Sequence, residues 1–193
     1  MDDTEINRKA ATVLLAGHNV TVVASVAQAK VALKRMSFDV LLTDLLVPVS
    51  QAGSEVHSGG EEFPHNWEGM EGQEIPLGLF LAVRALIGGV RLVAVVTDAD
   101  HHQHPAARAL DLILGANRLG DGTLLCVSDA KAWLKEDTLE PIPGKGGGYS
   151  TANESYEQIL DDKGRNIVGF KGLVKSKAWH TALKRLLETP EGT

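Results

Sequence analysis

Asp44 follows a short, continuous apolar run, and this pattern is the one in the sequence that most directly suggests chemistry. The run Val40 to Thr43 is typical of a β-strand buried on both faces, as in a parallel sheet covered by helices. Asp44 then lies at the carboxyl end of that strand, the edge at which open α/β sheets bind ligands. Because a buried carboxylate needs a partner, we expect Asp44 to contact water, a cation or a base. The alternative is that Asp44 is only a turn residue.

A second group of ligand-type side chains follows the β-prone run 90–96. Thr97 comes first, and the segment 98–104 then carries Asp98, Asp100, His101, His102 and His104. Such side chains bind Zn²⁺ or another transition metal in many proteins, and His57 and His65 are further candidate ligands. A solvated loop that caps the helix starting after Pro105 explains the same residues without a metal.

The order of apolar patterns predicts the elements that must position these residues. Apolar residues at helical spacing predict a first helix that ends at Gly17 and further helices over 26–36, 79–86, 106–114 and 179–186. A short helix is also expected around Trp133. Strands are expected at 21–24, 39–43, 90–96, 123–127 and 167–170. This alternation predicts one α/β domain over 1–193 with a parallel sheet.

Two stretches do not fit the alternation and are interpreted as insertions, approximately 49–75 and 129–166. The first holds six Glu, five Gly and two His with no Lys or Arg, which is unusual for a connection in a compact domain. The second contains the glycine-rich run 144–148, which lacks the order of residues of a phosphate-binding loop and is interpreted as a linker.

Composition narrows the class of protein. The chain has 193 residues, a formal charge of −6 and no apolar run long enough to span a bilayer, so we expect a cytoplasmic protein without a membrane partner. The single Cys126 lies in an apolar run and is expected to be a buried thiol. The negative charge argues against a nucleic-acid partner, although 163–185 is locally basic.

At this point the order of motifs resembles the receiver domain of two-component response regulators. Asp2-Asp3 resembles the acidic pair that ends the first receiver strand, and the segment 42–48, with proline four residues beyond Asp44, is similar to the phosphoacceptor segment. Gly78 resembles the glycine that opens the third helix, and 95–97 resembles the fourth strand with its terminal hydroxyl residue. Lys175, ahead of the last helix, resembles the lysine of the fifth strand, with Lys171 and Lys131 as weaker candidates.

This resemblance implies a flavodoxin-like, receiver-type doubly wound parallel sheet and a phosphorylated aspartate. Asp44 is then the nucleophile that accepts a phosphoryl group from a sensor histidine kinase or a phosphotransfer protein. Mg²⁺ is the implied cofactor, with Asp2, Asp3, Asp44 and the backbone carbonyl of Leu46 as ligands. Thr97 and Lys175 are the implied contacts of the phosphoryl group. The family's switch aromatic has Phe170 as its candidate, and the output partner is unknown.

Two departures from the receiver pattern affect these expectations. Receivers begin with an apolar strand ahead of the acidic pair, and this sequence starts at Met1. We therefore expect a gap between two parallel neighbours, unless the natural start lies upstream or another segment fills the slot. The lysine is also separated from the strand 123–127 by the second insertion and is not followed by proline.

Each implied role has a structural alternative, so three functions remain open. Asp2-Asp3 is equally well a helix cap, Thr97 a turn residue and Lys175 a solvated lysine. The first function is a stand-alone receiver-like signalling module, which is not an enzyme in the usual sense. The second is a receiver-derived protein-interaction domain that is never phosphorylated. The third is a metal-dependent hydrolase that uses Asp44 and the His-rich segment 98–104. Different observations support each function. Formation of an acyl phosphate supports the first, and Mg²⁺ binding without phosphorylation supports the second. Binding of stoichiometric Zn²⁺ supports the third.

Overall fold

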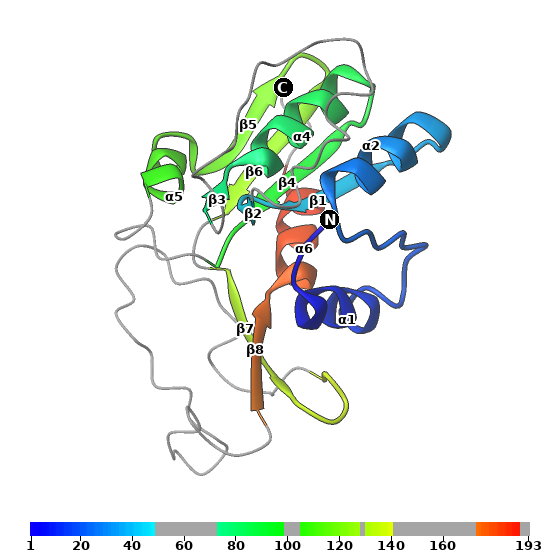
Figure 1. Cartoon of the computed structure of the whole chain (residues 1–193). Coiled ribbons are helices and arrows are strands. Elements are labelled where there is room, and N and C mark those ends of the chain that lie inside the picture. The colour runs from blue at the N-terminus through cyan, green and yellow to red at the C-terminus, as the bar shows by residue number, and fades with distance from the viewer. Residues whose placement is uncertain (49–72, 99–104, 128–129, 141–172, 190–193) are drawn as a thin grey trace.

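The computed structural model describes residues 1–48, 73–98, 105–127, 130–140 and 173–189. Most of both predicted insertions lies outside these ranges, as do the histidines of segment 98–104, His57, His65, the glycine run 144–148, the predicted strand 167–170 with Phe170, and Lys171. In the described part, the elements are arranged around one four-stranded sheet with helices on both faces (Figure 1).

The sheet is mostly parallel, and its strand order is β1-β4-β6-β5. β1 (Val40–Asp44), β4 (Leu92–Val96) and β6 (Gly122–Val127) run parallel, with Asp44 beside Val96 and Val96 beside Val127. β5 (Gly115–Leu119) adds an antiparallel strand at the edge. The prediction of an α/β fold with a parallel central sheet is therefore confirmed.

Side chains that alternate along the strands divide the core between the two faces of the sheet. Val93 and Val95 pack with α4 (Leu77–Ile87) and α5 (Pro105–Leu110), and α2 (Val26–Arg35) lies on this same face. Ala94 and Val96 pack on the other face, against α1 (Glu5–Leu14) and α6 (Trp179–Glu188). This alternation is the two-residue period of a strand buried on both sides.

Two short hairpins complete the described structure. β2 (Val47–Pro48) pairs with β3 (Glu74–Ile75) in an antiparallel arrangement. β7 (Lys131–Lys135) pairs with β8 (Leu173–Lys177), and this hairpin lies beyond the carboxyl ends of the sheet strands (Figure 1). β8 leads directly into α6, so the hairpin joins the last sheet strand to the last helix.

Three local predictions were wrong. The segment around Trp133 is the strand β7 and not a helix, because Ala132 and Leu134 alternate with more exposed neighbours and pack into the core. The predicted helix 106–114 ends at Leu110, continues as a short 3-10 helix over Asp111–Ile113, and is followed by β5. Residues 21–24 form no assigned strand.

The open side of β1, where a receiver would have its first strand, is filled at one position only. Residues 21–24 therefore pair with no strand in the described part of the chain. Met1 lies on the open side of β1, where its amino group donates to Leu42 O at 2.7 Å and its carbonyl accepts from Asp44 N at 2.9 Å. Asp2 N then donates to Val23 O at 3.2 Å. These are the hydrogen bonds of a single parallel strand position. Alongside them runs a groove of about 500 Å³ bounded by residues 20–23 on one side and 38–42 on the other.

Among the residues that the structure describes, no helix has the length and apolar character to cross a bilayer.

Candidate functional site

The candidate site is a buried ion-pair network at the carboxyl end of β1. Asp44 is 5% exposed, and its Oδ2 accepts from the Nζ of Lys177 at 2.8 Å. Its Oδ1 accepts from Leu46 N at 3.4 Å. The next strand, β4, brings Thr97 to the same edge, one residue beyond the Val96 that pairs with Asp44. Thr97 is buried, and its backbone bonds Val127 and Ala130 at 2.9 and 3.0 Å.

Asp2 is the second buried carboxylate of the network. It is 2% exposed and accepts from Lys177 Nζ at 2.9 Å, from Thr4 N at 2.8 Å and from the side-chain amide of Asn7 at 3.2 Å. Asp2 therefore fixes the backbone just ahead of α1 and also pairs with Lys177, a partner that the sequence did not indicate. Its role as a metal ligand stays a prediction.

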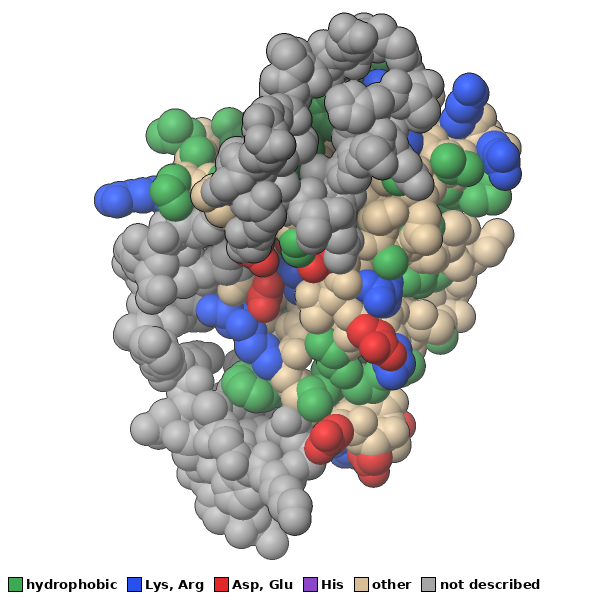
Figure 2. Space-filling view, in the orientation of Figure 1, with side chains coloured by type: hydrophobic (Ala, Val, Ile, Leu, Met, Phe, Trp, Pro, Cys, Tyr) green, Lys and Arg blue, Asp and Glu red, His purple; other side chains and the backbone are tan. Residues whose placement is uncertain are grey.

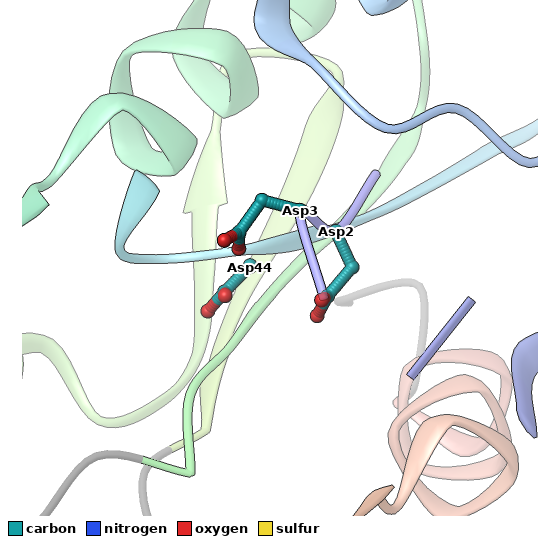
Figure 3. A group of neighbouring side chains, drawn as sticks. All are labelled: Asp2, Asp3 and Asp44. Carbon is teal, nitrogen blue, oxygen red and sulfur yellow. The ribbon is translucent and has the colours of Figure 1, made fainter. Parts of the chain in front are cut away.

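Asp3 brings a third carboxylate to the end of β1 (Figure 3). Each of Asp2, Asp3 and Asp44 offers one oxygen, and these oxygens lie within 4.8 Å of one another. Arg8 donates to the backbone carbonyl groups of Asp2 and Asp3, which ties this turn to α1.

Lys177 connects the network, although no sequence motif indicated it. Its side chain is 2% exposed and lies at the end of β8. Asn7 Oδ1 accepts from Ser176 Oγ at 3.0 Å and from Lys177 N at 3.1 Å, and Trp179 Nε1 donates to Asn7 O at 3.0 Å. Asn7 thus joins α1, β8 and α6 around the lysine.

Lys175 and Asp98 form the outer part of the same network. Lys175, the lysine predicted from sequence, pairs with Asp98 Oδ2 at 3.0 Å and is 41% exposed. Asp98 Oδ1 pairs with Lys177 at 3.3 Å. The structure therefore places Lys177, and not Lys175, between Asp2 and Asp44. On the face of the molecule shown in Figure 2, acidic side chains (red) lie next to basic ones (blue).

Burial and neighbouring charges shift the protonation of the network in different directions. Desolvation raises the pKa of Asp44 to about 7, against the opposing charge of Lys177. Burial also raises the pKa of Asp3, helped by the charge of Asp2. For Lys177, desolvation acts to lower the pKa, but the carboxylates, with Asp44 first, raise it above its ordinary value. Burial acts to raise the pKa of Asp98, and the charges of Lys177 and Lys175 hold it below its ordinary value.

The Met1 amino group lies beside these carboxylates. Burial lowers its pKa to about 6, although the charges of Asp2 and Asp44 act in the opposite direction.

The oxygen atoms at this site fit a hard divalent cation. Four carboxylates, from Asp2, Asp3, Asp44 and Asp98, are grouped with the ammonium groups of Lys175 and Lys177, the Met1 amino group and the Arg8 guanidinium. Carboxylate oxygens of this kind are the donors that Mg²⁺ prefers. Asp2, Asp3 and Asp44 are the residues that could hold it. Leu46 contributes to the site through its amide, which donates to Asp44 Oδ1.

Gly78 and Cys126 fit their predicted surroundings. A methyl group on Gly78 would overlap the carbonyl of Asp44, and Gly78 N donates to Leu45 O at 3.0 Å. Glycine therefore lets the start of α4 approach the end of β1.

Cys126 is a buried free thiol in β6, and burial raises its pKa to about 11.

Comparisons with protein-family models, with curated proteins and with solved structures found no match to this chain.

Proposed function

We propose that the chain is a receiver-like signalling module of flavodoxin-like architecture that is phosphorylated on Asp44. The single observation that carries this proposal is the buried ammonium group of Lys177, held between Asp44 Oδ2 at 2.8 Å and Asp2 Oδ2 at 2.9 Å at the carboxyl end of a parallel strand. A turn residue or a helix cap needs no such lysine.

The arrangement suits phosphoryl transfer, which requires positioning and neutralisation of charge more than acid–base chemistry. A carboxylate oxygen of Asp44 attacks the phosphorus of the donor. The bond between phosphorus and its leaving group breaks, and the leaving group takes the bonding electron pair. Lys177, already in contact with Asp44, balances negative charge on the transferred group.

Mg²⁺ bound by Asp2, Asp3 and Asp44 supplies further charge neutralisation when present. Asp3 suits this role because it is half-buried and is not among the carboxylates that pair with Lys177. Asn7 and Thr4 hold Asp2 in place while it faces the lysine.

The strand order supports the receiver interpretation. In this interpretation β1, β4 and β6 correspond to the last three receiver strands. The hydrogen bonds of Met1 to β1 then correspond to one position of the strand on the open side of β1. The proposed donors are a sensor histidine kinase or a phosphotransfer protein in the cytoplasm, which this sequence pattern implies. Lys177 belongs to the β7–β8 hairpin, whereas the corresponding receiver lysine belongs to a strand of the central sheet.

The experiment is to measure the intact mass of the chain after incubation with Mg²⁺ and acetyl phosphate. We expect the gain of one phosphoryl group, which is lost in Asp44→Asn and when EDTA replaces Mg²⁺. Asp39→Asn is the matched control, because Asp39 is exposed and immediately precedes the same strand. A folded protein that gains no mass, or a gain that persists in Asp44→Asn, contradicts the proposal.

A further inference from the structure

Asp98 is a carboxylate held between two lysines of one strand. Its Oδ1 lies 3.3 Å from Lys177 Nζ and its Oδ2 lies 3.0 Å from Lys175 Nζ. Residues two apart on a strand share a face, so both lysines of β8 project toward the same sheet edge. The two lysines thus form a pair of cations, and the anion between them is a protein side chain.

The ammonium group of Lys177 has no hydrogen-bonding capacity left over. A lysine ammonium has three donors, and Lys177 faces three carboxylates, those of Asp2, Asp44 and Asp98. A phosphoryl oxygen on Asp44 can therefore contact Lys177 only by replacing one of these partners.

The three partners differ in how readily they can be replaced. Asp44 carries the phosphoryl group, and Asp2 is 2% exposed and fixed by Asn7 and Thr4. Asp98 makes the longest of the three contacts, at 3.3 Å, and its side chain is 31% exposed. It also has Lys175 as a second cation on its outer side.

We propose that Asp98 is an internal competitor that occupies the phosphoryl-binding position at Lys177. This inference rests on the proposed phosphorylation of Asp44. The incoming phosphoryl group displaces the Asp98 carboxylate from Lys177, and Asp98 remains paired with Lys175. Asp98 forms and breaks no covalent bond in this step. Its effect is to weaken the binding of an anion beside Asp44 in the resting protein.

The test uses the full chain with Mg²⁺ and beryllofluoride, a non-covalent mimic of a phosphoryl group on a carboxylate. Asp98→Asn removes the competing charge and keeps the size of the side chain. We expect it to lower the beryllofluoride concentration at half-saturation on the order of tenfold, because a like charge a few ångströms from the bound anion is removed. Tryptophan fluorescence follows binding, since Trp179 lies next to this network.

The matched control is Glu140→Gln, which removes an ion pair of similar length with Lys135, at 3.1 Å, next to the same hairpin. It should leave the half-saturation concentration unchanged. Weaker beryllofluoride binding in Asp98→Asn would overturn the inference, because it would mean that Asp98 holds Lys177 in place. Equal binding in the wild type and Asp98→Asn also overturns it, while the proposed function stands. If neither protein binds beryllofluoride or gains a phosphoryl group from acetyl phosphate, the proposed function fails, and this inference fails with it.

Lys175→Met tests whether Lys175 acts through Asp98. Without Lys175, Asp98 pairs with Lys177 alone and competes more strongly, so beryllofluoride binding should weaken in the otherwise wild-type chain. In the Asp98→Asn background the same change should weaken binding less, because only the Lys175 charge is lost and no competing carboxylate is released. An equal loss of binding in both backgrounds would show that Lys175 acts on the anion independently of Asp98, and it would overturn the proposed roles of Asp98 and Lys175.

Discussion

Removal of the Lys177 charge tests the energetics of the site. Lys177→Met keeps a long, unbranched side chain but takes the ammonium group away from Asp2 and Asp44. The distances are 2.9 and 2.8 Å, and the two carboxylate side chains are 2% and 7% exposed. Water therefore cannot replace the lysine without a rearrangement of the structure.

The expected loss follows from these distances. At about 3 Å and an effective dielectric constant of about 20, each carboxylate–ammonium pair contributes about 6 kcal/mol of Coulomb energy. Desolvation of the ions offsets much of this, and the loss of one partner from a buried pair costs about 3–5 kcal/mol in measured cases. We expect Lys177→Met to lower the free energy of unfolding by about 3–5 kcal/mol at pH 7.5.

Asp44→Asn is the contrasting variant. Desolvation raises the pKa of Asp44 to about 7, so its folded-state pKa lies above the value in the unfolded chain. Above pH 7 the folded protein must therefore keep a charge that the unfolded chain carries more easily, and Asp44 lowers stability there. Asparagine avoids this charge while Lys177 retains Asp2 and Asp98. At pH 8 we expect Asp44→Asn to be at least as stable as the wild type.

The assay is urea unfolding followed by circular dichroism and tryptophan fluorescence, repeated between pH 5 and 8. In Lys177→Met the unpaired carboxylates take up protons in the folded state, so its deficit relative to the wild type should shrink as the pH falls. A deficit below about 1 kcal/mol, the value of an exposed ion pair, would refute the reasoning. An equal loss in Asp44→Asn would also refute it.

Three further predictions concern Asp44, the proposed nucleophile, and the residues that support it. The initial rate of phosphorylation by acetyl phosphate should rise with pH through about 7, because the reactive form of Asp44 is the carboxylate. A rate that is flat between pH 6 and 8 contradicts this. Gly78→Ala should destabilise the fold by about 1–3 kcal/mol and slow phosphorylation, because the new methyl group overlaps the Asp44 carbonyl. The control is Gly17→Ala, which has open space around the added carbon and should have neither effect. Asn7→Ala should lower the free energy of unfolding by about 2–3 kcal/mol in urea titrations, because Asp2, Ser176 and Lys177 each lose a buried hydrogen bond. A loss below about 0.5 kcal/mol would show that water replaces the amide.

The parallel sheet could be predicted from sequence because its strands are continuous apolar runs. Leu92–Val96 and Gly122–Val127 are almost entirely buried, whereas Val40–Asp44 is buried only at Thr43 and Asp44 and half-buried before them. Each pattern is short and bounded by polar or glycine residues. The antiparallel strand β5 was missed because its residues Ala116 to Leu119 continue a pattern that also suits a helix. The glycines at its ends were the available signal, since Gly115 and Gly120 adopt positive φ values of 89° and 61°.

The gap beside β1 was expected from sequence, but its consequence for 21–24 was not. A strand requires a neighbouring strand, and in the described part of the chain the one backbone-to-backbone hydrogen bond of these residues is from Asp2 N to Val23 O. A β-prone segment without a neighbouring strand therefore does not become part of a sheet. Local propensity cannot reveal this, because it depends on residues distant in sequence.

The choice between Lys175 and Lys177 shows why the site could be only partly predicted. Both lysines lie on one face of β8, and a shift of two residues in the strand register would exchange their places without changing the apolar pattern. The register is set instead by contacts distant in sequence: Lys131 pairs with Lys177 across the hairpin, and Asn7 accepts hydrogen bonds from Ser176 and Lys177. A lysine delivered by a separate hairpin is not fixed by the sheet that carries Asp44. Its place therefore depends on the pairing with β7 and on one asparagine of the first helix, whose part in the site no motif indicates.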